Sequence, residues 1–231
     1  MHKIYSPIPI NGSLTLSEEE SKHLCKVMRK QVGDQVLVLD GKGRKAVAEI
    51  SLAHPKHAEV TIIKVEEKSN RKTINLTIAI APTKNISRIE YFAEKATELG
   101  IDAIHPILCS QSERRVLKID RINKIMVAAM KQSGQVFLPK IEELTVLKEF
   151  IKNHPNGLIA HCPNHLINPK LLNEVKNRDA VTVLIGPEGD FTEEEVNFAL
   201  EHGYKTVSLG NSILRTETAG IYVCAVLSTL D

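Results

Sequence analysis

The sequence predicts an α/β protein in which a small β-barrel is followed by a mostly parallel sheet with flanking helices. Short runs of β-branched residues, such as Val181 to Ile185, are typical of strands buried on both faces of a parallel sheet. After residue 73 such runs alternate with helical segments, as in β-α-β units. Before residue 67 the strand patterns are separated by turn signals, which favours a small barrel.

The N-terminal domain is expected over residues 1–70. Its segment Ser17 to Gln31 has helical spacing, and Asp40-Gly41 with Gly43 forms a turn between two strands. The polar stretch Lys68 to Lys72 has no apolar face and marks the domain boundary, so the second domain is expected over residues 73–231. The strands expected in the first domain are Val36 to Leu39, Ala46 to Ile50 and Glu59 to Glu66.

The second domain is expected to begin with a buried strand at Ile74 to Ile80. A helix over Ile86 to Leu99 then ends at Gly100, and a strand follows at Ile104 to Leu108. The elements expected near the C-terminus are a strand at Val181 to Ile185, a helix that starts with the capping box of Thr192 and Glu195 and ends at about Glu201 before Gly203, a strand at Thr206 to Leu209, and a helix over Thr216 to Leu230 with Thr216 as its N-cap.

Two glycine-bearing loops connect these last strands to helices. Gly186-Pro187-Glu188-Gly189 follows the first strand, and Gly210-Asn211-Ser212 follows the second. If the two strands are neighbours in a parallel sheet, the loops lie side by side at the edge where α/β folds bind ligands. Neither loop matches a phosphate-binding motif, and no basic residue lies between Leu184 and Glu201. The loops therefore predict a pocket for a ligand without phosphates, although ordinary strand-to-helix turns have the same pattern.

Length and composition set outer limits on the kind of protein. The chain of 231 residues is 42% hydrophobic, which suffices for the core of one large or two modest domains. It has no apolar stretch long enough to span a bilayer and no signal-peptide core at its start, so we expect a soluble, cytoplasmic protein. The four cysteines, Cys25, Cys109, Cys162 and Cys224, are scattered, which predicts buried thiols and no metal site.

Basic residues are concentrated in the N-terminal part of the chain. The net charge is only +2, but residues 1–72 hold 13 Lys and Arg against 9 Asp and Glu. One group lies at helical spacing and another in the turn between two strands, and both could contact RNA phosphates or simply face solvent. These residues are Lys22, Lys26, Arg29 and Lys30 in the helix and Lys42, Arg44 and Lys45 in the turn.

Several motifs together resemble one bacterial family. LIGPEGDFTEEEV, followed by VSLGNSILRTETA, resembles the 16S ribosomal RNA uracil-N3 methyltransferases, the RsmE family of the SPOUT class of S-adenosylmethionine enzymes. The blocks EKATELG and KQSGQ, from Glu94 and Lys131, and HLCKVMRKQVGDQVLVLDGKG, from His23, are also similar to that family. The resemblance covers nearly the whole chain, and its paired C-terminal motifs are its most specific part.

The resemblance implies a fold, a cofactor and an assembly. It implies an N-terminal PUA-like barrel, a C-terminal domain tied in a trefoil knot, and a homodimer with the helix Thr216 to Leu230 in its interface. The apolar residues of that helix would equally suit an internal core helix. The implied S-adenosylmethionine contacts are Ile159, Ala160, His161, Leu184, Gly186, Pro187, Glu188, Gly189, Leu209, Gly210, Ile213, Leu214 and Thr218. For His161, a satisfied histidine at the rim is the more ordinary interpretation than a catalytic one.

The implied reaction requires a particular set of side chains. Uracil N3 becomes nucleophilic only when it loses its proton, which leaves negative charge on O2 and O4, and it is reachable only in an unpaired uridine. Arg215 and Arg114 are candidates to hold that charge, and Glu188 and Glu217 are candidates for the base or for orienting those arginines. Two alternatives remain open: Glu217 could merely complement a helix dipole, and Arg114 could merely be a salt-bridge partner of Glu113 or Asp120.

Three residues depart from the family pattern. Asp190 stands where a third glycine is common, Gln135 replaces an arginine, and Lys3 stands where the N-terminus commonly has arginine. The last two concern RNA contact, for which Lys3 is a further candidate. The expected partner is 16S ribosomal RNA within the small ribosomal subunit, with no membrane and no metal. Other hypotheses are ribose 2′-O-methylation by the same class of enzyme and a non-catalytic RNA-binding assembly factor.

Overall fold

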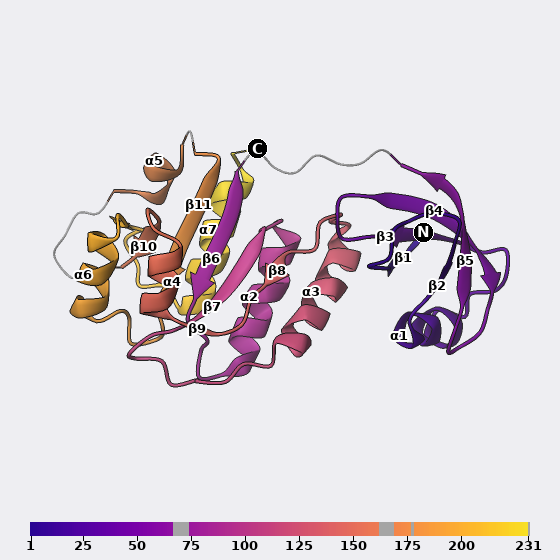
Figure 1. Cartoon of the computed structure of the whole chain (residues 1–231), viewed down its shortest axis with the longest axis horizontal. Helices are drawn as coiled ribbons and strands as arrows, with labels where there is room; N and C mark the ends of the chain where they lie inside the picture. Colours follow the sequence, from indigo (N-terminus) through magenta and orange to yellow (C-terminus); the bar gives the residue numbers. More distant parts are fainter. Residues whose placement is uncertain (67–73, 162–168, 177, 231) are drawn as a thin grey trace. The chain divides into compact units, whose positions relative to one another are not determined.

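The computed structural model describes residues 1–66, 74–161, 169–176 and 178–230. The chain forms two compact units (Figure 1). The first unit consists of Met1–Arg71 and Val127–Leu138, and the second of Lys72–Met126 and Pro139–Asp231. The sequence did not predict that Val127–Leu138 would join the first unit. The stretch Lys68 to Lys72, which we interpreted as the boundary, lies outside the described residues.

The first unit is built on a five-stranded sheet in the order β1-β3-β4-β5-β2. Side chains alternate along β4, so that Ala46, Ala48 and Ile50 are fully buried while Glu49 is exposed. The three strands expected here are present, and β1 and β2 were missed because such short segments carry little periodicity. The bounds are His2–Tyr5 for β1, Ser13–Thr15 for β2, Gln35–Leu39 for β3, Lys45–Leu52 for β4 and Glu59–Val65 for β5.

The expected helix of the first unit is shorter than predicted. Helix α1 (Glu18–Lys22) begins at the N-cap Ser17, whose hydroxyl accepts the Glu20 N–H at 3.2 Å, and continues into the π-helical turn η1 (His23–Val27). Arg29 has a φ of 52°, a left-handed conformation that ends helices. The prediction of a helix through Gln31 was therefore wrong at its C-terminal end, and Arg29 and Lys30 lie beyond it.

The second unit contains a sheet in the order β12-β10-β11-β6-β7-β8, with β9 also paired to β7. Its described pairings are all parallel, which confirms the expected sheet type. The parallel arrangement places the carboxyl ends of neighbouring strands at one edge. The bounds are Asn75–Ile80 for β6, Ala103–Leu108 for β7, Lys140–Ile141 for β8, Thr145–Val146 for β9, Leu158–Ala160 for β10, Ala180–Ile185 for β11 and Lys205–Val207 for β12.

Helices pack against this sheet and against one another. The C-terminal helix α7 packs on α2, where the ring of Phe92 lies so close to Gly220 that a Cβ there would sit 2.5 Å from it. Helix α7 starts at Thr216, so Arg215 is the N-cap and the prediction of Thr216 in that position was wrong. The bounds are Ile86–Glu98 for α2, Ile119–Ser133 for α3, Leu147–Asn153 for α4, Leu171–Val175 for α5, Glu193–Glu201 for α6 and Thr216–Ser228 for α7.

Candidate active site

A pocket of about 130 Å³ lies at the carboxyl ends of three strands of the second unit. The two glycine loops do not follow adjacent strands, because β10 lies between β11 and β12. Ala160 at the end of β10 pairs with Ile185 on one side and with Val207 on the other, so all three strands end together. The lining residues are Ala160, His161, Ile185, Gly186, Pro187, Glu188, Asp190, Val207, Leu209, Gly210, Ser212, Ile213, Leu214, Thr216 and Ala219.

The loop after β11 is folded tightly against its neighbours. A Cβ at Gly186 would lie 3.1 Å from the ring of Phe191, so the position has little room for a side chain. The carbonyl of Gly186 accepts a 3.0 Å hydrogen bond from the hydroxyl of Thr216 at the start of α7. This bond fixes the first glycine loop to the helix that follows the second one.

The start of α6 anchors the same loop on its other side. The predicted capping box is confirmed, since Thr192 and Glu195 each accept the other's backbone N–H. Glu195 is only 4% exposed and also accepts the backbone N–H and the hydroxyl of Ser110, at 2.7 and 3.0 Å. The loop after β7 is therefore hydrogen-bonded to the first turn of α6.

The loop after β12 depends on a conformation that side chains rarely adopt. Gly210 has a φ of 131°, and an added Cβ would meet no atom within 4 Å. Its backbone N–H donates to the hydroxyl of Ser208, which in turn donates to the Gly210 carbonyl. Ile213 on this loop is 93% exposed while Leu214 is half-buried. The loop thus presents apolar side chains at the mouth of the pocket.

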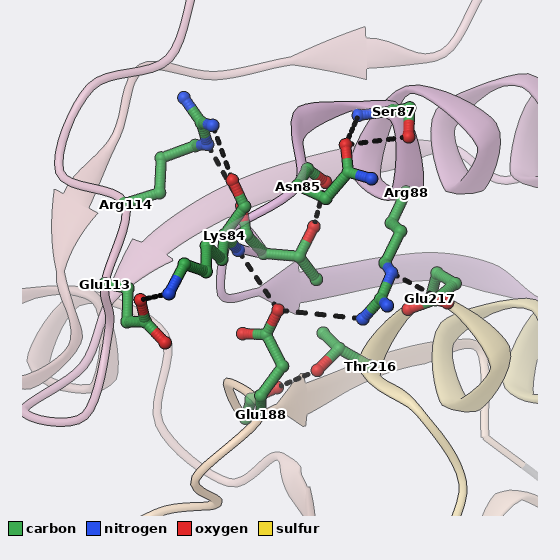
Figure 2. A network of polar contacts seen from close by, with 11 residues as sticks. Lys84, Asn85, Ser87, Arg88, Glu113, Arg114, Glu188, Thr216 and Glu217 are labelled. Carbon is green, nitrogen blue, oxygen red and sulfur yellow. Dashed lines mark hydrogen bonds and ion pairs between the residues drawn. The ribbon is translucent and has the colours of Figure 1, made fainter.

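The candidate catalytic carboxylates meet at an arginine that was not among the residues predicted from the sequence. Figure 2 shows the guanidinium of Arg88, on α2, between Glu188 and Glu217. It lies 3.9 Å from Glu188 Oε1 and 3.8 Å from Glu217 Oε1. Glu188 Oε1 also accepts the backbone N–H of Lys84 at 3.0 Å. Arg88 is one of several charged residues of the predicted helix Ile86 to Leu99, so local sequence carried no signal for it.

Glu217 is the more deeply buried of the two carboxylates. The residue is 8% exposed, and its Oε2 has no hydrogen-bond partner among the described residues. It lies in the first turn of α7, where a carboxylate complements the helix dipole. Glu217 does not line the pocket, whereas Glu188 does.

Arg114 holds the loop after β6 and, among the described residues, pairs with no carboxylate. Its Nε donates to the carbonyl of Thr83 at 3.0 Å, and its Nη2 donates to that of Lys84 at 2.6 Å (Figure 2). The expected alternative was a salt bridge with Glu113 or Asp120, but Glu113 pairs with the Lys84 ammonium at 2.8 Å. Since Lys84 in turn binds Glu188, Arg114 supports the loop on which that carboxylate rests.

Arg215 stands at the entrance of α7 with its side chain exposed. Its guanidinium makes no hydrogen bond or ion pair within the described part of the chain. The structure therefore joins Glu188, Glu217 and Arg114 through Arg88 and Lys84, and leaves Arg215 able to meet a ligand.

Four residues implied as cofactor contacts lie outside the pocket lining. Ile159 and Leu184 are fully buried in the core beneath the loops. Gly189 faces Gln111, whose Cβ would lie 3.2 Å from an added methyl group, and Thr218 is exposed on α7. Thr216 and Ala219 of the same helix line the pocket in place of the expected Thr218.

The first unit presents most of its candidate RNA-binding cations to solvent. Lys22, Lys26, Arg29, Lys42 and Arg44 are exposed, and no ion pair involves them within the described part of the chain. Two other candidates are engaged: Lys30 lies 3.5 Å from Asp34, and Lys45 lies 2.9 Å from Glu66.

Lys3 lies beside the segment that contains Gln135. Its ammonium donates to the carbonyl of Gln132 at 3.1 Å and would lie 3.0 Å from a Cβ at Gly134. Two of the three departures from the family pattern, Lys3 and Gln135, thus fall in one region of the first unit. A hollow of about 500 Å³ there is lined by Met1, His2, Lys3, Glu19, Glu20, His23, Ala128, Lys131 and Gln132.

The structure also places the cysteines and bears on metal-binding groups and membrane-spanning helices. Cys109 and Cys224 are buried as predicted, Cys25 is only half-buried, and Cys162 lies outside the described residues. Burial raises the pKa of the Cys109 thiol, so it stays protonated. Over the described ranges, no group of three or more His, Cys, Asp or Glu is arranged to hold a metal, and no helix has the length and apolarity to cross a membrane.

Comparison with known proteins identifies the family. The family model of an RNA methyltransferase domain matches residues 70–228, and that of an RNA methyltransferase PUA domain matches residues 16–63. A Synechocystis protein named ribosomal RNA small subunit methyltransferase E is 30% identical over 96% of this chain and 74% of its own length. The chain belongs to the ribosomal RNA small subunit methyltransferase E family. The resemblance noted in the sequence is thereby confirmed.

Solved structures of similar proteins have the same fold over their full length. A probable rRNA methyltransferase from Porphyromonas gingivalis is 34% identical with a TM-score of 0.88, covering 100% of this chain and 98% of that one. A ribosomal RNA small subunit methyltransferase E from Neisseria gonorrhoeae, bound to S-adenosylmethionine, is 26% identical with the same TM-score and coverage. The barrel-plus-α/β architecture is therefore that of the methyltransferase E family.

Proposed function

We propose that this chain transfers a methyl group from S-adenosylmethionine to N3 of an unpaired uridine in 16S ribosomal RNA of the small subunit. Membership of the methyltransferase E family makes the chain a ribosomal RNA methyltransferase. The finer proposal depends mainly on one observation: Glu188 both lines the pocket and belongs to the Arg88–Glu217 network. A base is thereby available where the methyl donor would bind.

The pocket residues fit S-adenosylmethionine. Ile185, Val207, Leu209 and Leu214 provide apolar walls for an adenine ring, and the φ of 131° at Gly210 lets backbone approach a ligand without a Cβ in the way. No Lys or Arg is found among the described lining residues, which suits a ligand without phosphates. When bound, the cofactor supplies a methyl group made electrophilic by a sulfonium.

We assign proton acceptance from uracil N3 to Glu188 and stabilisation of the resulting charge to Arg215. Glu188 lines the pocket and is held by the Lys84 N–H, whereas Glu217 lies outside the lining. Arg215 is exposed, and its planar guanidinium can donate hydrogen bonds to O2 and O4 of uracil as negative charge develops on them. Arg114 has two donors committed to carbonyls, so we assign it a positioning role.

The first unit is proposed to bind the RNA around the target. Its exposed cations can neutralise phosphates without breaking an existing ion pair, which makes electrostatic binding favourable. We further propose action in the cytoplasm, where an enzyme of ribosomal RNA would meet its substrate.

We also propose a homodimer and a knotted path for the second unit, as the family resemblance implies. In support of the dimer, α7 and α2 carry large apolar side chains that remain exposed, Tyr222 at 41% and Tyr91 at 51%. In support of the knot, the pocket is lined by residues at the ends of β10, β11 and β12, which follow one another in the chain but not in the sheet. Sedimentation equilibrium of the full chain tests the dimer.

Nucleoside mass spectrometry tests the reaction. Small-subunit RNA incubated with the protein and labelled cofactor should gain 3-methyluridine, and Glu188→Gln should reduce its formation by about 10²-fold or more. A methyl group on ribose would instead favour 2′-O-methylation. Calorimetry that detects no S-adenosylmethionine binding by the wild-type chain would favour a non-catalytic RNA-binding protein.

A further inference from the structure

The charged side chains that line the pocket are acidic. Among the described lining residues, the carboxylates are Glu188 and Asp190, and His161 is the third titratable group. Glu188 has Arg88 at 3.9 Å and the Lys84 N–H at 3.0 Å, so its charge is partly compensated. Within the described part of the chain, Asp190 has no Lys or Arg partner. Unlike Glu188, it has no permanently charged partner there, because its ion pair is with His161, which is charged only when protonated.

Asp190 occupies a position that would suit glycine. Its φ is 61°, in the left-handed region, where a residue with a Cβ costs roughly 1 kcal/mol more than glycine. Glycine would therefore form this turn at a lower cost in free energy than aspartate does. The Asp190 N–H donates to the Pro187 carbonyl at 3.0 Å, which closes the turn through backbone atoms and needs no carboxylate.

The carboxylate of Asp190 is held in a defined place on the pocket wall. Its Oδ1 accepts the backbone N–H of Phe191 at 2.7 Å, and its Oδ2 lies 3.0 Å from Nδ1 of His161. The side chain is 43% exposed, while that of His161 is 19% exposed. The charge is thus fixed by two neighbours and still accessible from the pocket.

We propose that Asp190 makes the pocket select the methyl donor over its demethylated product by charge. This inference rests on the proposed use of S-adenosylmethionine. The cofactor carries a sulfonium, an ammonium and a carboxylate, for a net positive charge, whereas S-adenosylhomocysteine has lost the sulfonium charge with the methyl group. The proton released from uracil N3 balances the reaction. A fixed carboxylate attracts the cationic donor, and this attraction ends when the methyl group leaves, so that the product is held less tightly.

Calorimetry on the full chain with each ligand separately tests the proposal. Asp190→Asn keeps a side chain that tolerates left-handed backbone and can accept hydrogen bonds, but it removes the charge. Its affinity for S-adenosylmethionine should fall by about three- to tenfold, as expected for a partly exposed charge pair, while affinity for S-adenosylhomocysteine stays unchanged. The loss of affinity for S-adenosylmethionine should be smaller at high salt concentration, because salt screens exposed charges. Asp190→Gly should behave in the same way without the backbone strain.

Glu193→Gln is the matched control. Glu193 is exposed in the first turn of α6, three residues from Asp190, and does not line the pocket, so its charge removal should leave both affinities unchanged. Equal loss of both ligands in Asp190→Asn would assign the residue to loop structure and overturn the proposal, as would unchanged affinity for the donor. Failure of the wild-type chain to bind either ligand would instead contradict the proposed function. Unfolding midpoints show that each variant is folded.

Discussion

At the scale of single residues, the structure separates the two candidate arginines. Arg114 supports the loop that carries Lys84, and Lys84 holds Glu188. Arg215 is exposed at a helix entrance whose backbone is fixed by the bond between Thr216 and the Gly186 carbonyl. A rigid backbone below a free guanidinium is the arrangement expected for preorganised stabilisation of developing charge.

The first prediction therefore concerns Arg215→Lys. The substitution keeps the charge but loses the planar pair of donors, so turnover should fall by about 10²-fold while cofactor affinity changes little. Single-turnover kinetics and calorimetry measure the two quantities. Wild-type turnover in Arg215→Lys together with a strong loss in Arg114→Lys would transfer the role to Arg114. A collapse of cofactor affinity would make Arg215 a pocket-shaping residue.

The second prediction concerns Gly210→Val. A branched side chain at a φ of 131° is strained and projects into space that no protein atom occupies, beside the apolar wall of the pocket. Affinity for S-adenosylmethionine should fall by more than about tenfold while the fold is retained. Gly33→Val is a control, because Gly33 also has a positive φ with nothing within 4 Å but does not line the pocket. Equal affinity in the two variants would contradict the pocket assignment.

At the scale of elements, close packing of α7 on α2 positions the site residues. Helix α7 carries Thr216 and Glu217, and α2 carries Arg88, so the distance between these helices sets the geometry of the network in Figure 2. Gly220 allows the approach, since a Cβ there would lie 2.5 Å from Phe92 and 3.3 Å from Ile80.

The third prediction is that Gly220→Ala lowers the free energy of unfolding by about 1–3 kcal/mol, because the added methyl group overpacks the interface. Urea unfolding followed by circular dichroism measures the change. Phe92→Leu makes room for the added methyl group. The double variant should therefore lose less free energy of unfolding than the sum of the losses of the two single variants. Strict additivity would show that the two residues are not in contact.

The fourth prediction concerns pH and the contact of β7 with α4. The ring of His105 meets that of Phe150 at a tilt and that of His154 edge-on, with centroid distances of 5.1 Å in both cases. Burial lowers the pKa of His105 below 6.5, and the charge of His154 adds to the effect. The folded state thus disfavours the protonated ring, so stability is full above the ordinary histidine pKa and declines as pH falls through it. His105→Phe should lose less stability than wild type between about pH 7.5 and about pH 5.5 in urea unfolding. An identical pH dependence would contradict this.

At the scale of the whole molecule, charge is divided between the two units. The net charge of +2 conceals a basic first unit, whose exposed Lys22 and Lys26 lie on or beside α1 without ion pairs within the described part of the chain. The pocket proposed to bind the cofactor lies in the second unit. Binding of RNA and binding of cofactor should therefore be separable by substitution.

The fifth prediction is that Lys22→Gln with Lys26→Gln weakens RNA binding without changing cofactor affinity. Each lysine–phosphate contact that the substitutions remove should reduce the magnitude of the slope of log affinity against log salt concentration by about 0.7 to 0.9. Filter binding across a salt series and calorimetry make the two measurements. Lys152→Gln, at an exposed lysine of α4, is the control and should retain the wild-type slope. An unchanged slope in the double variant would assign Lys22 and Lys26 to a solvated face.

The sequence by itself determined the local elements and the chemistry of the loops. Runs of β-branched residues located β6 and β11 to within one residue, and the capping box at Thr192 located the start of α6. These features depend on the hydrophobic periodicity and hydrogen bonding of residues that are close in sequence, so they can be recognised from a short segment. The absence of basic residues in the loop after β11 likewise indicated a ligand without phosphates.

Tertiary structure decided which residues meet. It inserted β10 between β11 and β12, placed Arg88 between two carboxylates, and set His161 against Asp190. It also assigned Val127–Leu138 to the first unit. Strand order and contacts between distant side chains follow from how crossover connections pack around a shared core, and no periodicity within a segment encodes them. For this reason the sequence could name Glu188 as a candidate, while only the fold could show what holds it.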